Sequence, residues 1–190
     1  MNYNLANLLT LTRIAFVPVM VVVFYLPIEL NHLLSAAIFG LAALTDWLDG
    51  YVARHFNQTS KFGAFLDPVA DKFMVAVALL LLVTDAPEPV WAFVIPTAVI
   101  IGREIAVSAL REWMANMGRQ SLVAVSMAGK VKTTTQMIAI FLLLLRNPIG
   151  PIPVYWIGYM GLYIAALMTL WSMICYLMAA WPELTRQDQP

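Results

Sequence analysis

Residues 65–83 read FLDPVADKFMVAVALLLLV. The second half of this segment is apolar throughout, whereas the first half carries Asp67 and Asp71. A helix needs about 20 mostly apolar residues to cross the hydrocarbon core of a membrane, and this segment has that length. We therefore expect a membrane-spanning helix with two carboxylates near its beginning.

The rest of the chain shares this apolar character. Of its 190 residues, 62% are hydrophobic and 12% are charged, and the mean hydropathy is +0.79. This excludes a soluble domain, which would need more polar residues to cover its surface. The net charge of zero argues against a nucleic-acid partner. The sequence predicts an all-α polytopic membrane protein, a bundle of six transmembrane helices in one domain over residues 1–190, with spans at 8–26, 33–52, 65–83, 90–110, 131–145 and 154–180.

The linkers between these spans alternate in charge. Three are short and rich in proline, and two are longer and basic. Lysine and arginine gather in cytoplasmic segments, and every basic residue except Arg146 falls on one side if the N-terminus is cytoplasmic. We expect both termini, and a polar cavity, to face the cytoplasm. Trp47 and Trp171 lie inside spans, and we expect them to pack in the core.

Four aspartates occur in the second and third spans. Asp46 and Asp49 are three residues apart, and Asp67 and Asp71 are four apart. On a helix each pair shares one face, and two antiparallel helices joined by a short loop bring the pairs together. Four carboxylates in one pocket repel one another, so we expect divalent cations to neutralise them.

The residue types indicate which ions and which chemistry. Oxygen ligands without His or Cys favour Mg²⁺, Mn²⁺ or Ca²⁺ over zinc, and two such ions can clamp both oxygens of a phosphoryl displacement. Gly50, Ala53 and Gly63 clear space for a bulky ligand near the backbone, and Arg54 offers a bidentate phosphate donor. A proton relay or an ion pathway is the alternative use of aspartates in a membrane.

The spacing Asp-x2-Asp-Gly-x2-Ala-Arg-x8-Gly-x3-Asp-x3-Asp over residues 46–71 resembles the signature of the CDP-alcohol phosphotransferase family. The resemblance implies six transmembrane helices, a homodimer, and two Mg²⁺ or Mn²⁺ ions at an active site that faces the cytoplasm. It assigns the role of general base to Asp71. It also assigns the metal ions to Asp46, Asp49, Asp67 and Asp71, and the border of the CDP group to Gly50, Ala53, Arg54 and Gly63.

A second polar set lies in and before the later spans and consists of Arg103, Arg111, Lys130 and Lys132. Cations beside a metal site suit the phosphate of a phosphorylated acceptor. The alternative is that these side chains reach toward the cytoplasmic surface and anchor the helices. Glu104 is expected to pair with a neighbouring arginine.

Three stretches resemble bacterial members of the family that make phosphatidylglycerophosphate: 7–13 (NLLTLTR), 102–118 (GREIAVSALREWMANMG) and 126–137 (SMAGKVKTTTQM). This resemblance implies CDP-diacylglycerol as donor, sn-glycerol 3-phosphate as acceptor, and the bacterial inner membrane as location. Asn7, Thr10 and Arg13 are expected near the mouth of the active site. The alternatives are cardiolipin, phosphatidylserine or phosphatidylinositol-phosphate synthesis within the family, and cation transport outside it.

Overall fold

The structure is a computed structural model that describes residues 5–56, 61–118 and 127–184. These residues form six α-helices, which confirms the predicted all-α fold with one helix for each apolar run. The helices are α1 (Leu5–Tyr25), α2 (Asn31–Phe56), α3 (Lys61–Thr84), α4 (Trp91–Asn116), α5 (Met127–Leu145) and α6 (Val154–Leu184).

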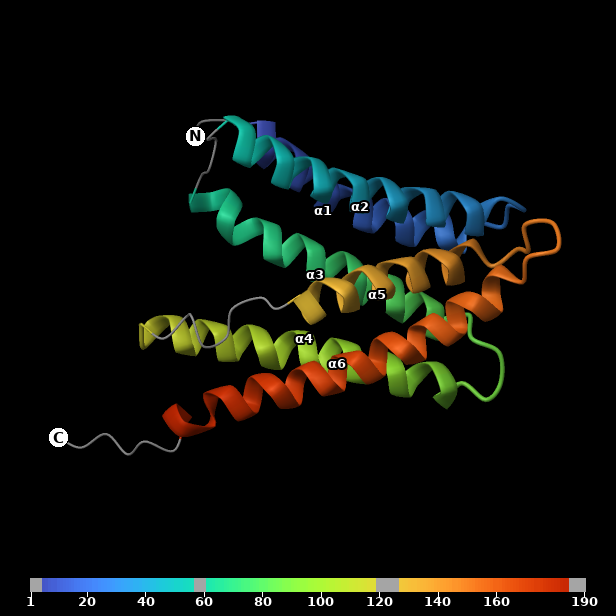
Figure 1. Ribbon diagram of the computed structural model, residues 1–190. Coiled ribbons are helices and arrows are strands. Elements are labelled where there is room, and N and C mark those ends of the chain that lie inside the picture. The colour runs from blue at the N-terminus through green and yellow to red at the C-terminus, as the bar shows by residue number, and fades with distance from the viewer. Residues whose placement is uncertain (1–4, 57–60, 119–126, 185–190) are drawn as a thin grey trace.

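Successive helices run up and down the bundle, so that α1 begins and α6 ends at the same end (Figure 1). α1 packs against α2 and α3, α5 packs against α2 and α6, and α4 packs against α6 and α3. The short loops account for the antiparallel order, because they leave no length for a crossover along the bundle. α3 also contacts α5, which places α3 between the first two helices and the last three.

The core is built from small and large apolar side chains that fit closely. Gly158 and Gly161 of α6 face α5, where an added Cβ would come within 3.0 Å of Leu142 and Ala139 respectively. Small residues at such positions let two helix backbones approach each other. The two glycines therefore explain why α5 and α6 pack so extensively.

The outer surface of the bundle is apolar. Three helices in the described part of the chain are long and apolar enough to cross a membrane, over Leu8–Tyr25, Trp91–Asn116 and Val154–Pro182. Phe65, Met178 and Trp171 are among many large side chains that remain exposed. The expectation that Trp171 packs in the core is wrong, since 70% of its surface is exposed. The Trp47 side chain lies outside the described residues. Apolar exposure on this scale is not tolerated by a soluble monomer.

The end of the bundle where α1 ends and α2 begins, which we call the linker end, carries a group of charged side chains. Arg146, after α5, donates a hydrogen bond to Asp85, after α3. His32, at the start of α2, has its Nε2 3.3 Å from Arg146 NH1 and 3.9 Å from Asp85 Oδ2. Burial and the Arg146 guanidinium lower the pKa of His32. This group ties together three segments that lie far apart in the sequence.

Candidate active site

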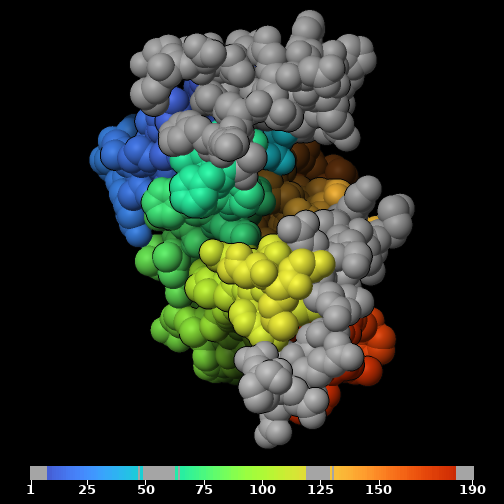
Figure 2. Space-filling view, turned by 90° about the vertical axis from the view of Figure 1, so that its left-hand side faces the viewer, coloured from blue at the N-terminus to red at the C-terminus, as the bar shows by residue number. Residues whose placement is uncertain are grey.

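We call the end of the bundle where α1 begins and α6 ends the site end. The predicted site residues that the structure describes lie in the half of each helix nearer this end, apart from Arg103, which is at the middle of α4. Figure 2 views the bundle from this end, where the beginning of α3 lies beside the end of α4. Lys132, near the beginning of α5, reaches Glu104 of α4. Six helices of alternating direction thus bring residues 10–13, 46, 67–71, 103–111 and 132 to one end of the molecule.

The polar face of α1 contacts both helices that carry the aspartates. Arg13 NH1 lies 2.8 Å from Asp46 Oδ1 of α2, and the Thr10 hydroxyl donates a hydrogen bond to Asp67 of α3. Thr10 and Arg13 are one turn apart and are 0% and 1% exposed. Since a buried arginine requires a paired charge, the Asp46 ion pair accounts for the position of Arg13 inside an otherwise apolar helix.

Asp71 lies one turn beyond Asp67 on α3. The Asp46 and Glu104 carboxylates and the Arg13 guanidinium all act on it electrostatically. No hydrogen bond to its carboxylate occurs within the described part of the chain, so both oxygens can accept a proton or bind an ion. The structure therefore brings one aspartate of the α2 pair into electrostatic reach of the α3 pair.

The chemistry of these side chains fits a hard divalent cation, because the available donors are carboxylate oxygens. Among the described side chains, no three of His, Cys, Asp and Glu are close enough to hold one ion. The Asp49 side chain lies outside the described residues. The metal assignment of the four aspartates stays a prediction.

The residues expected beside the CDP group are described only in part. Gly63 is buried in the first turn of α3, as a position that needs close approach would be. The remaining predicted side chains that lie outside the described residues are Asn7, Gly50, Ala53, Arg54 and Lys130.

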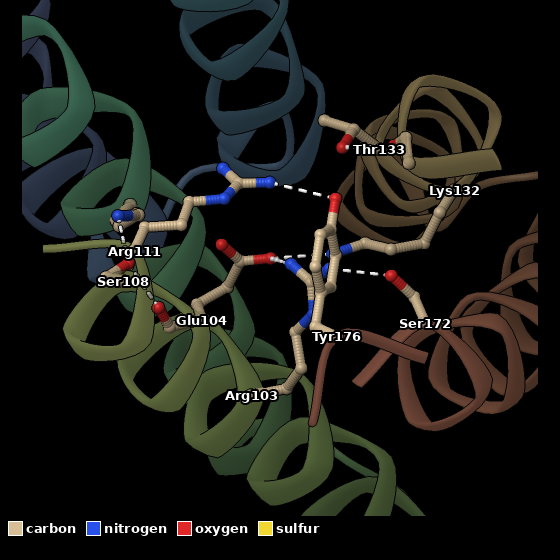
Figure 3. A network of polar contacts seen from close by, with 10 residues as sticks. Arg103, Glu104, Ser108, Arg111, Lys132, Thr133, Ser172 and Tyr176 are labelled. Atoms are coloured by element: carbon tan, nitrogen blue, oxygen red, sulfur yellow. Dashed lines mark hydrogen bonds and ion pairs between the residues drawn. The ribbon is translucent and has the colours of Figure 1, made fainter. Parts of the chain in front are cut away.

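A buried group of cations surrounds Glu104 (Figure 3). Glu104 Oε1 accepts hydrogen bonds from Lys132 Nζ of α5 at 2.6 Å and from Arg103 NH1 at 3.1 Å. Lys132 is 2% exposed and Arg103 is 7% exposed. The expected pairing of Glu104 with an arginine is confirmed, and Lys132 joins it from another helix. Such burial is inconsistent with side chains that only reach for the membrane surface.

α6 completes this group with two residues that sequence analysis missed. Ser172 accepts a hydrogen bond from Arg103 NH2 at 2.9 Å, and Tyr176 accepts one from Arg111 NH2 at 3.0 Å. The guanidinium carbons of Arg103 and Arg111 lie 5.6 and 5.2 Å from the centre of the Tyr176 ring, within the range of cation–π attraction. The i, i+4 spacing of Ser172 and Tyr176 in a long apolar helix was the available signal.

A small cavity lies between Asp71 and Glu104, the carboxylate that pairs with the buried cations. It is lined by α3, α4 and α5, through Asp71, Lys72, Val75, Glu104, Thr133 and Gln136. Lys72 donates a hydrogen bond to Ser108, whose hydroxyl donates to the Glu104 carbonyl oxygen at 2.5 Å. Asp71 and Glu104, the carboxylate that pairs with Arg103 and Lys132, thus border one space.

Comparison with known proteins indicates the family of the chain. The sequence profile of the CDP-alcohol phosphatidyltransferase family matches residues 3–180. Proteins named CDP-diacylglycerol--glycerol-3-phosphate 3-phosphatidyltransferase from Salmonella choleraesuis (strain SC-B67) and Escherichia coli (strain K12) are 51% and 50% identical over 190 residues. Each alignment covers 98% of this chain and 100% of the relative. The chain belongs to the CDP-alcohol phosphatidyltransferase family.

Proposed function

We propose that the protein transfers the phosphatidyl group of CDP-diacylglycerol to sn-glycerol 3-phosphate, which yields phosphatidylglycerophosphate and CMP. The observation that carries this proposal is the cavity bordered by Asp71 and by Glu104, the partner of Arg103 and Lys132. Glycerol 3-phosphate has a hydroxyl at one end, which must lose its proton, and a phosphate at the other end, which binds cations. The names of relatives at 50 to 51% identity support the same reaction.

In this proposal all six helices cross the bacterial inner membrane, with the termini and the active site toward the cytoplasm, and the protein is a homodimer. The apolar outer surface and the three long apolar helices support insertion. The basic linkers support the orientation, since lysine and arginine favour the cytoplasmic side. The diacylglycerol chains of the donor can stay in the bilayer while its head group enters the site end.

Two divalent cations, Mg²⁺ or Mn²⁺, are proposed to bind Asp46, Asp49, Asp67 and Asp71, with Gly50, Ala53, Arg54 and Gly63 beside the CDP group. When bound, such ions neutralise the diphosphate of the donor and so favour attack at phosphorus. The protein prepares the ligands, because Arg13 orients Asp46 and Thr10 orients Asp67. One carboxylate from each helix is thereby fixed by α1 before any ligand arrives.

The acceptor phosphate is proposed to bind Arg103, Arg111, Lys130 and Lys132. Without the acceptor, Glu104 serves as counter-ion to Arg103 and Lys132, as buried cations require. The incoming phosphate competes for these donors and gains charge-assisted hydrogen bonds from them. Tyr176 and Ser172 hold the two guanidinium groups in place, so less side-chain freedom is lost on binding.

The proposed chemical step is a direct displacement. Asp71 takes the proton of the primary hydroxyl of the acceptor, the resulting oxygen attacks the lipid-side phosphorus, and CMP leaves with the bonding electrons. Asp71 suits this role because its carboxylate faces the cavity without a hydrogen-bond partner among the described residues. Positioning and charge neutralisation, rather than a covalent enzyme intermediate, supply the rate enhancement.

The test is CMP release by the purified protein with CDP-diacylglycerol and Mg²⁺ or Mn²⁺. The acceptors are supplied separately: glycerol 3-phosphate, glycerol, serine, inositol 1-phosphate and phosphatidylglycerol. We expect release that requires both the metal and glycerol 3-phosphate and stops when a chelator is added. Release with only a different acceptor would be consistent with the mechanism but would refute glycerol 3-phosphate as the acceptor. Metal flux into proteoliposomes without any CMP release would instead support a transporter.

A further inference from the structure

Gln136 is a buried polar side chain that the mechanism above does not use. It is 3% exposed and lies on α5. Its Oε1 atom has no hydrogen-bond partner within the described part of the chain. Buried carbonyl groups are nearly always paired with protein, water or a ligand. The missing partner of Gln136 therefore points to something that enters from the cavity that Gln136 lines.

The position of Gln136 on α5 follows from helical spacing. It lies four residues after Lys132 and three after Thr133, so all three share one face of the helix. Lys132 reaches Glu104 from this face, and Thr133 and Gln136 line the cavity with Glu104 and Asp71. Gln136 thus borders the same space as the proposed base and as the carboxylate that holds the cations.

The acceptor has a group that matches this position. In sn-glycerol 3-phosphate the attacking hydroxyl and the phosphate are at opposite ends, and a secondary hydroxyl lies on the carbon between them. If Asp71 takes the proton of the attacking hydroxyl and the cations bind the phosphate, the secondary hydroxyl needs a hydrogen-bonding partner on the wall of the cavity. Asp71 and Glu104 already have other roles, and Lys72 can only donate. The exposed Thr133 hydroxyl donates to the Gly129 carbonyl oxygen at 3.0 Å, whereas the Gln136 carboxamide oxygen is a buried acceptor without a partner among the described residues.

We propose that the Gln136 carboxamide accepts a hydrogen bond from the secondary hydroxyl of the acceptor and so selects glycerol 3-phosphate over phosphorylated alcohols that lack this hydroxyl. This inference rests on the proposed function. A water molecule is the competing partner of Gln136, and it would leave the choice of acceptor unaffected. The two alternatives predict different ratios of kcat/KM for an acceptor with the secondary hydroxyl and an acceptor without it.

The experiment compares kcat/KM for glycerol 3-phosphate with kcat/KM for 1,3-propanediol monophosphate, which lacks only the secondary hydroxyl. We expect the native protein to prefer glycerol 3-phosphate by about tenfold to a hundredfold, as for a site that loses a buried hydrogen bond. Gln136→Met keeps the length of the side chain and removes the carboxamide, so the preference should fall close to one. Most of this change should come from a lower kcat/KM for glycerol 3-phosphate.

Thr135→Val is the matched control on the same helix. The Thr135 hydroxyl bonds to the Val131 carbonyl oxygen of its own helix at 3.0 Å, and its loss should leave the preference unchanged. If Gln136→Met does not fold, Gln136→Asn, which withdraws the carboxamide by one methylene, should reduce the preference in the same way. A general packing defect would lower both rates together and leave their ratio intact.

Three results overturn the inference. Equal use of the two acceptors by the native protein would show that the secondary hydroxyl is not read, although the proposed function would stand. A native preference that persists in the folded Gln136 variants would assign the selection to another residue. Absence of CMP release with both acceptors, in a native preparation that is active with a different alcohol, would refute the proposed function as well.

Discussion

The two ends of the helix bundle both carry charged groups, but they hold them differently. At the site end the Arg13, Arg103 and Lys132 side chains are almost completely buried. Their carboxylate partners are more exposed, Asp46 at 52% and Glu104 at 24%. At the linker end the Arg146 and Asp85 side chains are 42% and 36% exposed. The same residue types therefore occur in two environments within one molecule.

This difference matters because burial changes what a charged pair does. An exposed ion pair is screened by solvent and contributes about 0 to 1 kcal/mol. A buried pair often gives little net stability over an apolar replacement, so stability alone does not explain three buried cations in an apolar bundle. We infer that the charged side chains at the site end bind ligands, whereas those at the linker end connect the segments between helices. Matched substitutions at the two ends test this division.

The largest effect is expected for removal of a proposed metal ligand. Asp67→Asn should abolish CMP release and change the thermal unfolding midpoint little, because the amide oxygen still accepts the hydrogen bond of Thr10. The matched control is Asp85→Asn at the linker end, which should retain activity. Activity should be measured over a range of Mg²⁺ and Mn²⁺ concentrations. A fully active Asp67→Asn protein would contradict the proposed metal assignment.

A smaller effect on activity is expected when a guanidinium group is replaced by an ammonium group, which keeps the positive charge. Arg103→Lys keeps the charge and loses the fork that reaches Glu104 and Ser172 at once, and Lys and Arg are not equivalent at such sites. The KM for glycerol 3-phosphate should rise about tenfold to a hundredfold, since a charge-assisted hydrogen bond is worth about 1.5 to 3 kcal/mol. The KM for CDP-diacylglycerol should change much less.

Arg146→Lys is the control for that comparison, because Arg146 pairs with Asp85 at the linker end. Both KM values should match those of the native protein. If Arg103→Lys left the KM for glycerol 3-phosphate unaltered, Arg103 would have to be reassigned from phosphate binding to helix packing.

A single hydroxyl at each end gives the next, smaller contrast. Tyr176→Phe removes the hydrogen bond to Arg111 and keeps the ring beside both guanidinium groups. The loss of one such bond, about 0.5 to 1.5 kcal/mol, should raise the KM for glycerol 3-phosphate about two- to tenfold. Tyr25→Phe removes an exposed bond to Thr84 at the linker end and should leave the kinetics unchanged. Equal effects of the two variants would refute a positioning role for Tyr176.

The sequence predicted the helices better than it predicted their contacts. Six apolar runs were sufficient for six helices, because length and hydropathy are local properties. The spacing of Asp67 and Asp71 was also readable, since both lie on one helix. The partners of Arg103 and Arg111 on α6 were not, because Ser172 and Tyr176 come from a helix about 70 residues later. Their i, i+4 spacing marks one face of α6 but does not say which helix that face meets.

The exposure of Trp171 is a second case in which the sequence did not predict which face of a helix is buried. A large aromatic residue in the middle of an apolar span was expected to pack in the core, and it lies on the outer surface instead. In a membrane the surface can be as apolar as the interior, so hydrophobicity no longer separates the two. Only the packing of α6 against α4 and α5 decides which face is buried.

The smallest effect is expected from protonation at the linker end. The pKa of His32 is lowered by burial and by Arg146, while Asp85, already paired with Arg146, faces it at 3.9 Å. A base with a lower pKa in the folded state binds fewer protons there than in the unfolded state. Stability should therefore rise with pH across the interval that ends near the unfolded value of about 6.5, and acidification below that value should lower it.

His32→Gln should remove this part of the pH dependence, measured as the thermal unfolding midpoint in detergent between about pH 5 and pH 7.5, a window around the ordinary histidine pKa. Activity at neutral pH should be unaffected, because His32 is neutral there and lies at the end of the bundle away from the site. A change in the KM for glycerol 3-phosphate in this variant would mean that the linker end influences the active site. The division of roles between the two ends would then have to be abandoned.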